Sequence, residues 1–164
     1  MARIRLRRAC LAGIAGSAVG VAVYQGLVPF VARFTLDPRR QSAGFMSVLS
    51  ILLAHPPAAT HLIAAALVWL LVFGCVYGIL FALMAANLPG SGWQKGLTFG
   101  VLIWIVSYGF FEFLSPWTQF SEPLPLLALE LSMWLVVAVA EGIVIAAAMT
   151  THTENASLRE RKAA

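Results

Sequence analysis

Charge is scarce in this chain. Only 11% of its 164 residues are Asp, Glu, Lys or Arg, whereas 60% are hydrophobic. A soluble domain carries about 25% charged residues and about 45–50% apolar ones. So few charges cannot form a water-soluble surface around so many apolar side chains. The composition therefore excludes an ordinary soluble domain and indicates that lipid surrounds much of the chain.

Cysteines and recognisable catalytic motifs are also lacking. The chain has two cysteines, Cys10 and Cys75, and no C-x-x-C pair on which thiol–disulfide chemistry could rest. It has no phosphate-binding loop, nucleophile elbow, zinc motif or paired catalytic His and Ser. The sequence therefore predicts neither an enzymatic activity nor a bound cofactor.

The net charge of +4 does not indicate a nucleic-acid partner. Most of the positive charge lies at the two ends of the chain, next to apolar stretches. Basic residues in that position are typical of topology signals in membrane proteins. We therefore expect a lipid bilayer, and no nucleic acid, as the partner of these residues.

Four apolar stretches are long enough to cross a membrane. They cover residues 11–34, 61–86, 93–115 and 125–149. About 20 apolar residues span the hydrocarbon layer as a helix, and a helix satisfies its own backbone polar groups in lipid. The first stretch could instead be a signal peptide, but it exceeds the usual core of about 7–15 apolar residues. The sequence predicts an all-α, four-helix transmembrane bundle in a single membrane domain, with the first span uncleaved.

The segment between the first two spans contains a shorter apolar stretch, residues 44–54. It is too short to cross the bilayer and is followed by Pro56 and Pro57, which stop a helix. We expect an interfacial or re-entrant helix here. Residues 151–164 form a polar tail that we expect to be frayed.

The distribution of Lys and Arg predicts the orientation. With four spans, one side of the membrane holds eight of these residues and the other holds Arg33, Arg39 and Arg40. The eight are Arg3, Arg5, Arg7, Arg8, Lys95, Arg159, Arg161 and Lys162. Because cytoplasmic segments carry the excess of Lys and Arg, both termini should lie in the cytoplasm.

Every span carries small residues four positions apart, the spacing that lets helices pack closely in lipid. These rows are Ala12, Gly16 and Gly20; Gly74, Gly78 and Ala82; Gly96 and Gly100; and Ala138, Gly142 and Ala146. They predict a compact bundle. They also leave room for a homo-oligomer or for packing within a larger membrane complex.

Three of the six glutamates, Glu112, Glu130 and Glu141, fall inside the spans. An ionisable group there costs roughly 2.5–3.5 kcal/mol and usually faces the bundle interior with a partner. Glu112 and Glu130 should lie about 5 Å and about 8 Å from the outer ends of their spans. Arg33 lies at the end of the first span and His61 at the start of the second, on the same side of the membrane. We expect these four residues to converge.

Glu141 follows Glu130 by eleven residues. Eleven steps of ~100° return to nearly the same helix face, about 16 Å further along the axis. A stripe of carboxylates could form a proton or cation pathway or an outward-opening polar pocket, in which two close carboxylates share a proton. The alternative is a structural network, with Arg33 paired to Glu112 or Glu130 and Glu141 bonded to Tyr, Ser or Trp donors. The sequence leaves both open.

Trp69 and Trp134 should lie at similar depths in the outer half of their spans. They could line an apolar pocket, or they could pack in the bundle or face lipid. His55 and His61 come from one segment near one face, whereas haem in a bundle needs histidines that face each other from different helices. We therefore predict no haem and no metal.

A resemblance rests on residues 88–147. The run Leu-Pro-Gly-Ser-Gly-Trp-Gln-Lys-Gly at 88–96 is followed by Phe-Glu-Phe-Leu-Ser-Pro-Trp at 111–117, Leu-Glu-Leu at 129–131 and Glu-Gly at 141–142. This pattern is similar to small, uncharacterised bacterial membrane proteins with four spans. The resemblance implies a location in the bacterial inner membrane and implies no activity.

Two hypotheses of function follow. The first is a structural or accessory membrane subunit, supported by the small-residue rows and the lack of catalytic motifs. The second is a small proton- or cation-linked transporter that uses the intramembrane carboxylates.

Overall fold

The computed structural model describes the backbone of residues 6–163 and the side chains of residues 6–114 and 117–150. Within residues 6–163 every regular element is helical and no strand occurs. The α-helices are α1 (Leu6–Thr35), α2 (Ala43–Ala54), α3 (Ala59–Val68), α4 (Gly74–Met84), α5 (Trp93–Ile103), α6 (Phe110–Glu112), α7 (Thr118–Phe120) and α8 (Leu124–Ala163). Three π-helical segments interrupt them: η1 (Trp69–Phe73), η2 (Trp104–Gly109) and η3 (Phe113–Trp117).

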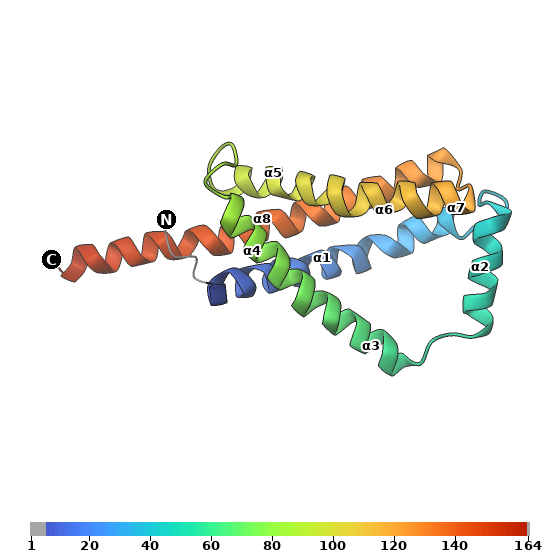
Figure 1. Cartoon of the computed structure of the whole chain (residues 1–164), viewed down its shortest axis with the longest axis horizontal. Helices are drawn as coiled ribbons and strands as arrows, with labels where there is room; N and C mark the ends of the chain where they lie inside the picture. Colours follow the sequence, from blue (N-terminus) through green and yellow to red (C-terminus); the bar gives the residue numbers. More distant parts are fainter. Residues whose placement is uncertain (1–5, 164) are drawn as a thin grey trace.

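Three helices in the described part of the chain are long and apolar enough to cross a membrane. They are Leu6–Thr35, Ala59–Met84 and Leu124–Thr150. The stretch expected to form the third span lies in a continuous run of α and π turns over residues 93–120. The protein is therefore a helical membrane protein with three such helices, beside which this fourth helical run packs (Figure 1).

Helix α8 is central to the bundle. It has its most extensive contacts with α1 and α5, and α4 packs against α1 (Figure 1). Glycines set these contacts, since a methyl group at Gly96 would lie 2.6 Å from the carbonyl oxygen of Gly142. A methyl group at Gly78 would overlap the carbonyl oxygen of Ala9. The small-residue rows are thus in contact within one chain.

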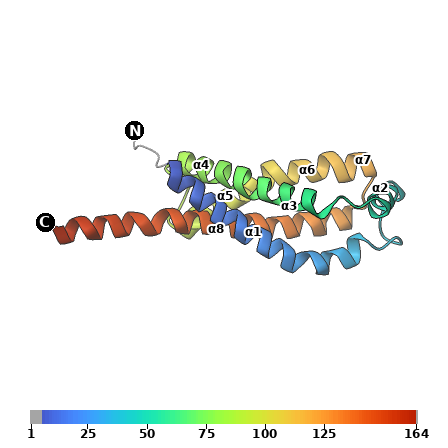
Figure 2. The same ribbon diagram turned by 90° about the horizontal axis from the view of Figure 1, so that it is seen from below.

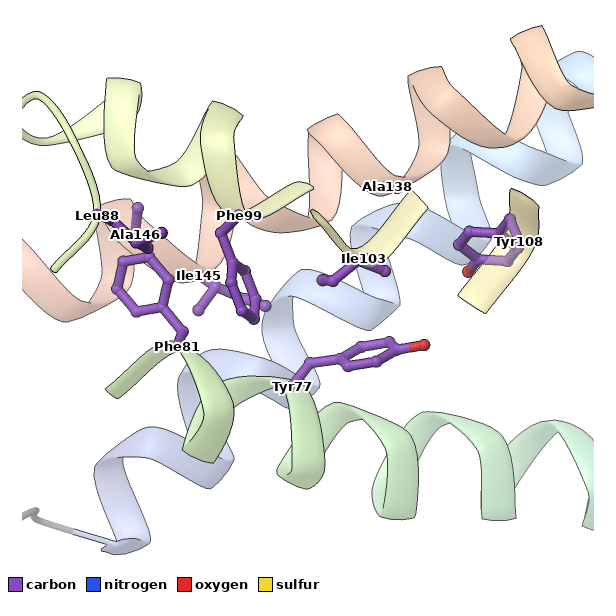
Figure 3. Close-up of a cluster of buried hydrophobic side chains, with 9 residues drawn as sticks. All are labelled: Tyr77, Phe81, Leu88, Phe99, Ile103, Tyr108, Ala138, Ile145 and Ala146. Carbon is purple, nitrogen blue, oxygen red and sulfur yellow. The ribbon is translucent and has the colours of Figure 1, made fainter. Parts of the chain in front are cut away.

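A buried hydrophobic cluster lies where α4, α5 and α8 meet (Figure 3). Phe81 of α4 and Phe99 of α5 meet edge to face, with ring centroids 5.2 Å apart. Ile145 and Ala146 of α8 close the cluster from the third side and are fully buried. In lipid, such contacts stabilise the bundle by close packing and not by exclusion of water.

Helix α3 and segment η1 diverge from the bundle (Figure 1). All ten residues of α3 are exposed. The second span contacts α1 closely at Gly74 and Gly78, in the half toward Met84. Its other half, α3, has no buried residue and therefore packs little against the neighbouring helices.

Helix α2 lies across the long axis of the bundle at the end away from the start of α1 and the end of α8, and we call this the outer end and the opposite one the inner end (Figure 1). It begins and ends within one residue of the stretch 44–54 that the sequence singled out. Ser42 caps it, accepting a hydrogen bond from the backbone N–H of Phe45 at 3.2 Å. A short apolar helix across the bundle axis has the orientation of an interfacial helix.

The structure does not have the frayed C-terminal tail that we expected from the sequence. Helix α8 continues to Ala163 and extends beyond the rest of the bundle (Figures 1 and 2). The segment after residue 151 is rich in Ala, Leu, Glu, Arg and Lys, which are strong helix formers. No proline interrupts the helix there.

Candidate functional site: two groups of buried glutamates

Three glutamates meet near the outer end of the bundle, and we call them the outer triad: Glu112, Glu122 and Glu130. Each provides one carboxylate oxygen, and these oxygens all lie within 4.8 Å of one another. Glu112 is 5% exposed and Glu122 is 2% exposed, while Glu130 is partly buried. They come from α6, from the turn between α7 and α8, and from α8.

Glu122 enters the triad because the chain reverses just before it. Ser121 adopts the left-handed conformation with φ 53°. The side-chain amide of Gln41, in the connection after α1, donates to Glu122 Oε1 at 2.7 Å. The same amide nitrogen donates to the carbonyl oxygen of Thr35 at 3.3 Å, and Gln41 Oε1 accepts from the Ser42 N–H at 2.8 Å. Both ends of the Gln41 amide are therefore held, and the amide fixes one oxygen of Glu122.

The triad has no compensating charge among the described side chains. Glu112 Oε2 and Glu122 Oε2 are buried without a hydrogen-bond partner. In the described ranges 6–114 and 117–150, the one ion pair joins Arg40 to Asp37. Two buried carboxylates and a partly buried one this close to one another are not expected to be ionised together unless a cation lies between them. The arrangement therefore requires protons on the carboxylates or a bound cation.

Arg33 and His61 do not join the triad, contrary to the expected convergence. Val31 and Thr35 are buried, so Arg33 lies on the opposite, exposed face of the last turn of α1. His61 is exposed because it belongs to α3, which diverges from the bundle. Neither forms an ion pair with a described glutamate, so the proposed pairing of Arg33 with Glu112 or Glu130 is wrong.

Glu141 is buried elsewhere in the bundle. It is 2% exposed and packs against Gly20 of α1, where a methyl group would overlap its carboxylate. Its Oε2 atom has no hydrogen-bond partner. Glu141 is not among the glutamates that meet in the outer triad. The two carboxylates of α8, Glu130 and Glu141, therefore lie in different surroundings.

Two cavities of about 330 Å³ each lie beside these glutamates. Glu141 lines the first and Glu112 lines the second. Tyr108 lines both cavities. So do Trp69 and Trp134, the two tryptophans that the sequence offers as candidate pocket residues. Aromatic rings therefore lie between the outer triad and Glu141.

The aromatic rings form an ordered stack. Trp134 lies between Tyr24 and Tyr108, with ring centroids 5.0 Å and 4.6 Å away and interplanar angles of 11° and 8°. Trp69 stacks on Phe73 at 4.3 Å. Trp69 lies in η1 and Tyr108 in η2, so π turns present both residues to the cavities. Such π turns are frequent at functional sites.

Glu122 and Gln41 were not singled out from the sequence. Both lie in connections between helices, whereas the predicted polar cluster drew only on residues within or at the ends of the spans. One signal was present: Glu122 stands between the αL-forming Ser121 and Pro123, at a sharp turn that leads into a long apolar helix. The metal site was likewise not expected, whereas the structure brings together three carboxylates that could hold one ion.

One protein-family model matches residues 5–160 of the chain. The chain belongs to that family, DUF6789, a family of unknown function. Comparisons with curated proteins and with solved structures each gave no match. The DUF6789 match covers every buried glutamate described above, and membership assigns them no activity.

Proposed function

We propose that this DUF6789 protein is a small transporter of protons or metal cations in the bacterial inner membrane. In this proposal the chain crosses the membrane four times, with residues 93–120 as the third span and both termini in the cytoplasm. The observation that carries the proposal is the outer triad, in which two buried carboxylates and a partly buried one have no cationic partner among the described side chains.

The spacing of the triad suits a hard cation. Ca²⁺ lies about 2.3–2.6 Å from its oxygen ligands and Mg²⁺ about 2.0–2.1 Å. Two oxygens on opposite sides of such an ion are therefore about 4–5 Å apart. The triad oxygens lie within 4.8 Å of one another, so one ion could contact all three. With no ion bound, protons can fill the same role, so cation binding and proton binding are alternatives at one site, and binding of a cation releases protons.

The accessory-subunit hypothesis has less support. It was supported by the lack of catalytic motifs and by small-residue rows, which left room for packing against another chain. These rows contact α1, α4, α5 and α8 of the same chain instead. A role as a subunit of a larger complex stays a prediction, and no described surface favours it over transport.

The test is a flux measurement in proteoliposomes. Proton flux is followed with an internal pH dye, and Ca²⁺ or Mn²⁺ uptake with a radioactive tracer. We expect the wild type to exceed protein-free liposomes, and Glu112→Gln, Glu122→Gln and Glu130→Gln to lower the flux at least tenfold. The matched control is Asp37→Asn, an acid on the outer connection paired to Arg40 at 3.3 Å, which should change the flux less than twofold.

Two results would overturn the proposal. One is a wild-type flux no greater than that of empty liposomes for protons and for both metals. The other is a flux that survives the double change Glu112→Gln and Glu130→Gln in protein that remains monodisperse in detergent. Chelation by EDTA separates the two cargoes, because it stops metal uptake and leaves a proton flux intact.

A further inference from the structure

Glu141 lies at the base of the first cavity. It is not part of the outer triad, and it forms no ion pair with a described cation. Its carboxylate is 2% exposed and Oε2 has no hydrogen-bond partner. A buried carboxylate in a membrane span is costly and is commonly paired. Among the described side chains it has no ion-pair partner, so a ligand that enters this cavity meets an uncompensated acceptor.

The walls of this cavity are aromatic. Tyr24, Trp69, Tyr108 and Trp134 all line it, and they come from α1, η1, η2 and α8. The stack on Trp134 covers one face of Tyr24 and one face of Tyr108, which leaves the other face of each free of stacking. Trp69 likewise stacks through one face only, on Phe73. Aromatic faces attract cations, most strongly where water is excluded.

The rim of the cavity is exposed on the side of the divergent helix. Ala66 of α3 and Val21 and Gln25 of α1 form this rim, and all three are exposed. The base, with Glu141, Tyr108 and Val137, is buried or partly buried. The exposed rim residues come from α1 and α3, so the cavity opens between these two helices, toward the surface that lipid would cover.

We propose that this cavity binds an amphiphilic organic cation, a quaternary ammonium or alkylammonium group, with Glu141 as its counter-charge and the aromatic rings as its walls. This site goes beyond the proposed transport at the outer triad and does not depend on it. The cavity volume of about 330 Å³ lies at the lower end of the range of small-molecule sites, about 300–1,000 Å³, so a compact head group fits.

Other occupants fit the cavity less well. A small inorganic ion needs several oxygen ligands and favours carboxylates. This cavity offers one carboxylate, the Gln25 amide at its exposed rim and two tyrosine hydroxyls, and its other side chains are apolar or aromatic. A neutral lipid chain would fill an apolar cavity but would leave Oε2 of Glu141 buried without a hydrogen-bond partner. An organic cation satisfies both the carboxylate and the rings.

The experiment measures binding of tritiated benzyltrimethylammonium to the full chain in lipid nanodiscs. We expect saturable binding by the wild type and binding at least tenfold weaker in Glu141→Gln, which keeps the side-chain shape. Trp69→Leu should weaken binding about fivefold. Asp37→Asn, on the connection between α1 and α2, and Trp93→Leu, an exposed tryptophan at the start of α5, are the matched controls and should stay within twofold of the wild type.

A neutral competitor separates charge recognition from simple filling of an apolar cavity. Neopentylbenzene has the shape of benzyltrimethylammonium with carbon in place of nitrogen. Unlabelled benzyltrimethylammonium should displace the label, and neopentylbenzene should fail to do so at tenfold higher concentration. This comparison uses the wild type alone, so it decides the question even if Glu141→Gln does not fold.

The proposal is overturned if the wild type shows no saturable binding, if the neutral compound displaces the label equally well, or if folded Glu141→Gln binds as tightly as the wild type. Failure of the transport proposal is a different result. It would appear as an absent flux with benzyltrimethylammonium binding intact, whereas failure of this inference would leave the triad-dependent flux unchanged.

Discussion

The inner and outer halves of the bundle are built differently. In the inner half, glycines bring α1 against α4 and α5 against α8 until backbone meets backbone. In the outer half, aromatic side chains, π turns and the divergent α3 leave cavities. In lipid, helices gain by close packing, so small residues are needed wherever they touch. Where bulky residues replace them, space remains, and the buried carboxylates border that space.

The two halves also differ in how they hold charge. At the inner end, Arg8 donates hydrogen bonds to the carbonyl oxygens of Ala148, at 3.3 Å, and Met149. Lys95 donates to the carbonyl oxygen of Ala85 at 2.5 Å. Lys95 thus lies at the C-terminal end of α4, whereas Arg8 bonds carbonyl oxygens within α8, and both lie far along the bundle from the outer triad. The carboxylates are therefore left for a partner that the described chain does not supply.

The largest effect is expected from a substitution that disrupts the close helix packing of the inner half. Gly78→Ala places a methyl group against the backbone carbonyl of Ala9, which cannot turn away as a side chain can. We expect a loss of about 3 kcal/mol, the upper part of the usual cost of overpacking. The measurement is thermal unfolding in detergent, followed by circular dichroism.

The matched control for this change is Gly26→Ala, a glycine in helix α1. A methyl group at Gly26 meets nothing within 4 Å. Alanine is the better helix former, so this variant should be as stable as the wild type or slightly more stable. Equal losses in the two variants would mean that the contact between α1 and α4 does not hold the inner half together.

A smaller effect is expected where the outer half is fixed by hydrogen bonds. Gln41→Met removes the amide that donates to Glu122 Oε1 at 2.7 Å. A buried carboxylate oxygen then loses its donor, at a cost of about 1–3 kcal/mol. Thermal unfolding should show this loss, whereas Gln119→Met, at an exposed position of α7, should show almost none.

The double variant Gln41→Met with Glu122→Met sharpens this test. Replacing both partners by apolar groups can be nearly neutral, because no buried polar group is left unpaired. We therefore expect the double variant to be more stable than Gln41→Met alone. Simple addition of the two single losses would show that Gln41 and Glu122 act independently.

Hydropathy predicted the helices well because the length of an apolar stretch is a local property. Residues 44–54 reappear as α2, and the three candidate spans begin and end within about five residues of the predicted stretches. The π turns of η1, η2 and η3 could not be predicted in this way. A π turn shifts the faces of a helix, whereas the sequence argument assumed a uniform 3.6-residue period.

The candidate sites were predicted only in part. Helix depth and period bring Glu112 to the level of Glu130, and the structure places both in the outer triad. Depth alone could not tell that Arg33 lies on the exposed face of α1, or that Glu122 turns inward from a connection. Those facts depend on the rotation of each helix about its axis and on the conformation of one turn, which are set by contacts between distant segments.

The smallest effect is expected at Arg33. Arg33→Gln removes an exposed charge without an ion-pair partner among the described residues, so the unfolding free energy should change by less than about 0.5 kcal/mol. Arg8→Gln is the matched comparison, because Arg8 bonds two carbonyl oxygens at the inner end, and it should cost about 1–2 kcal/mol. Thermal unfolding and the proteoliposome flux are measured on both variants. If Arg33→Gln lowers either quantity as much as Arg8→Gln does, then Arg33 reaches the outer triad in the membrane, and the triad has the cationic partner that its geometry otherwise lacks.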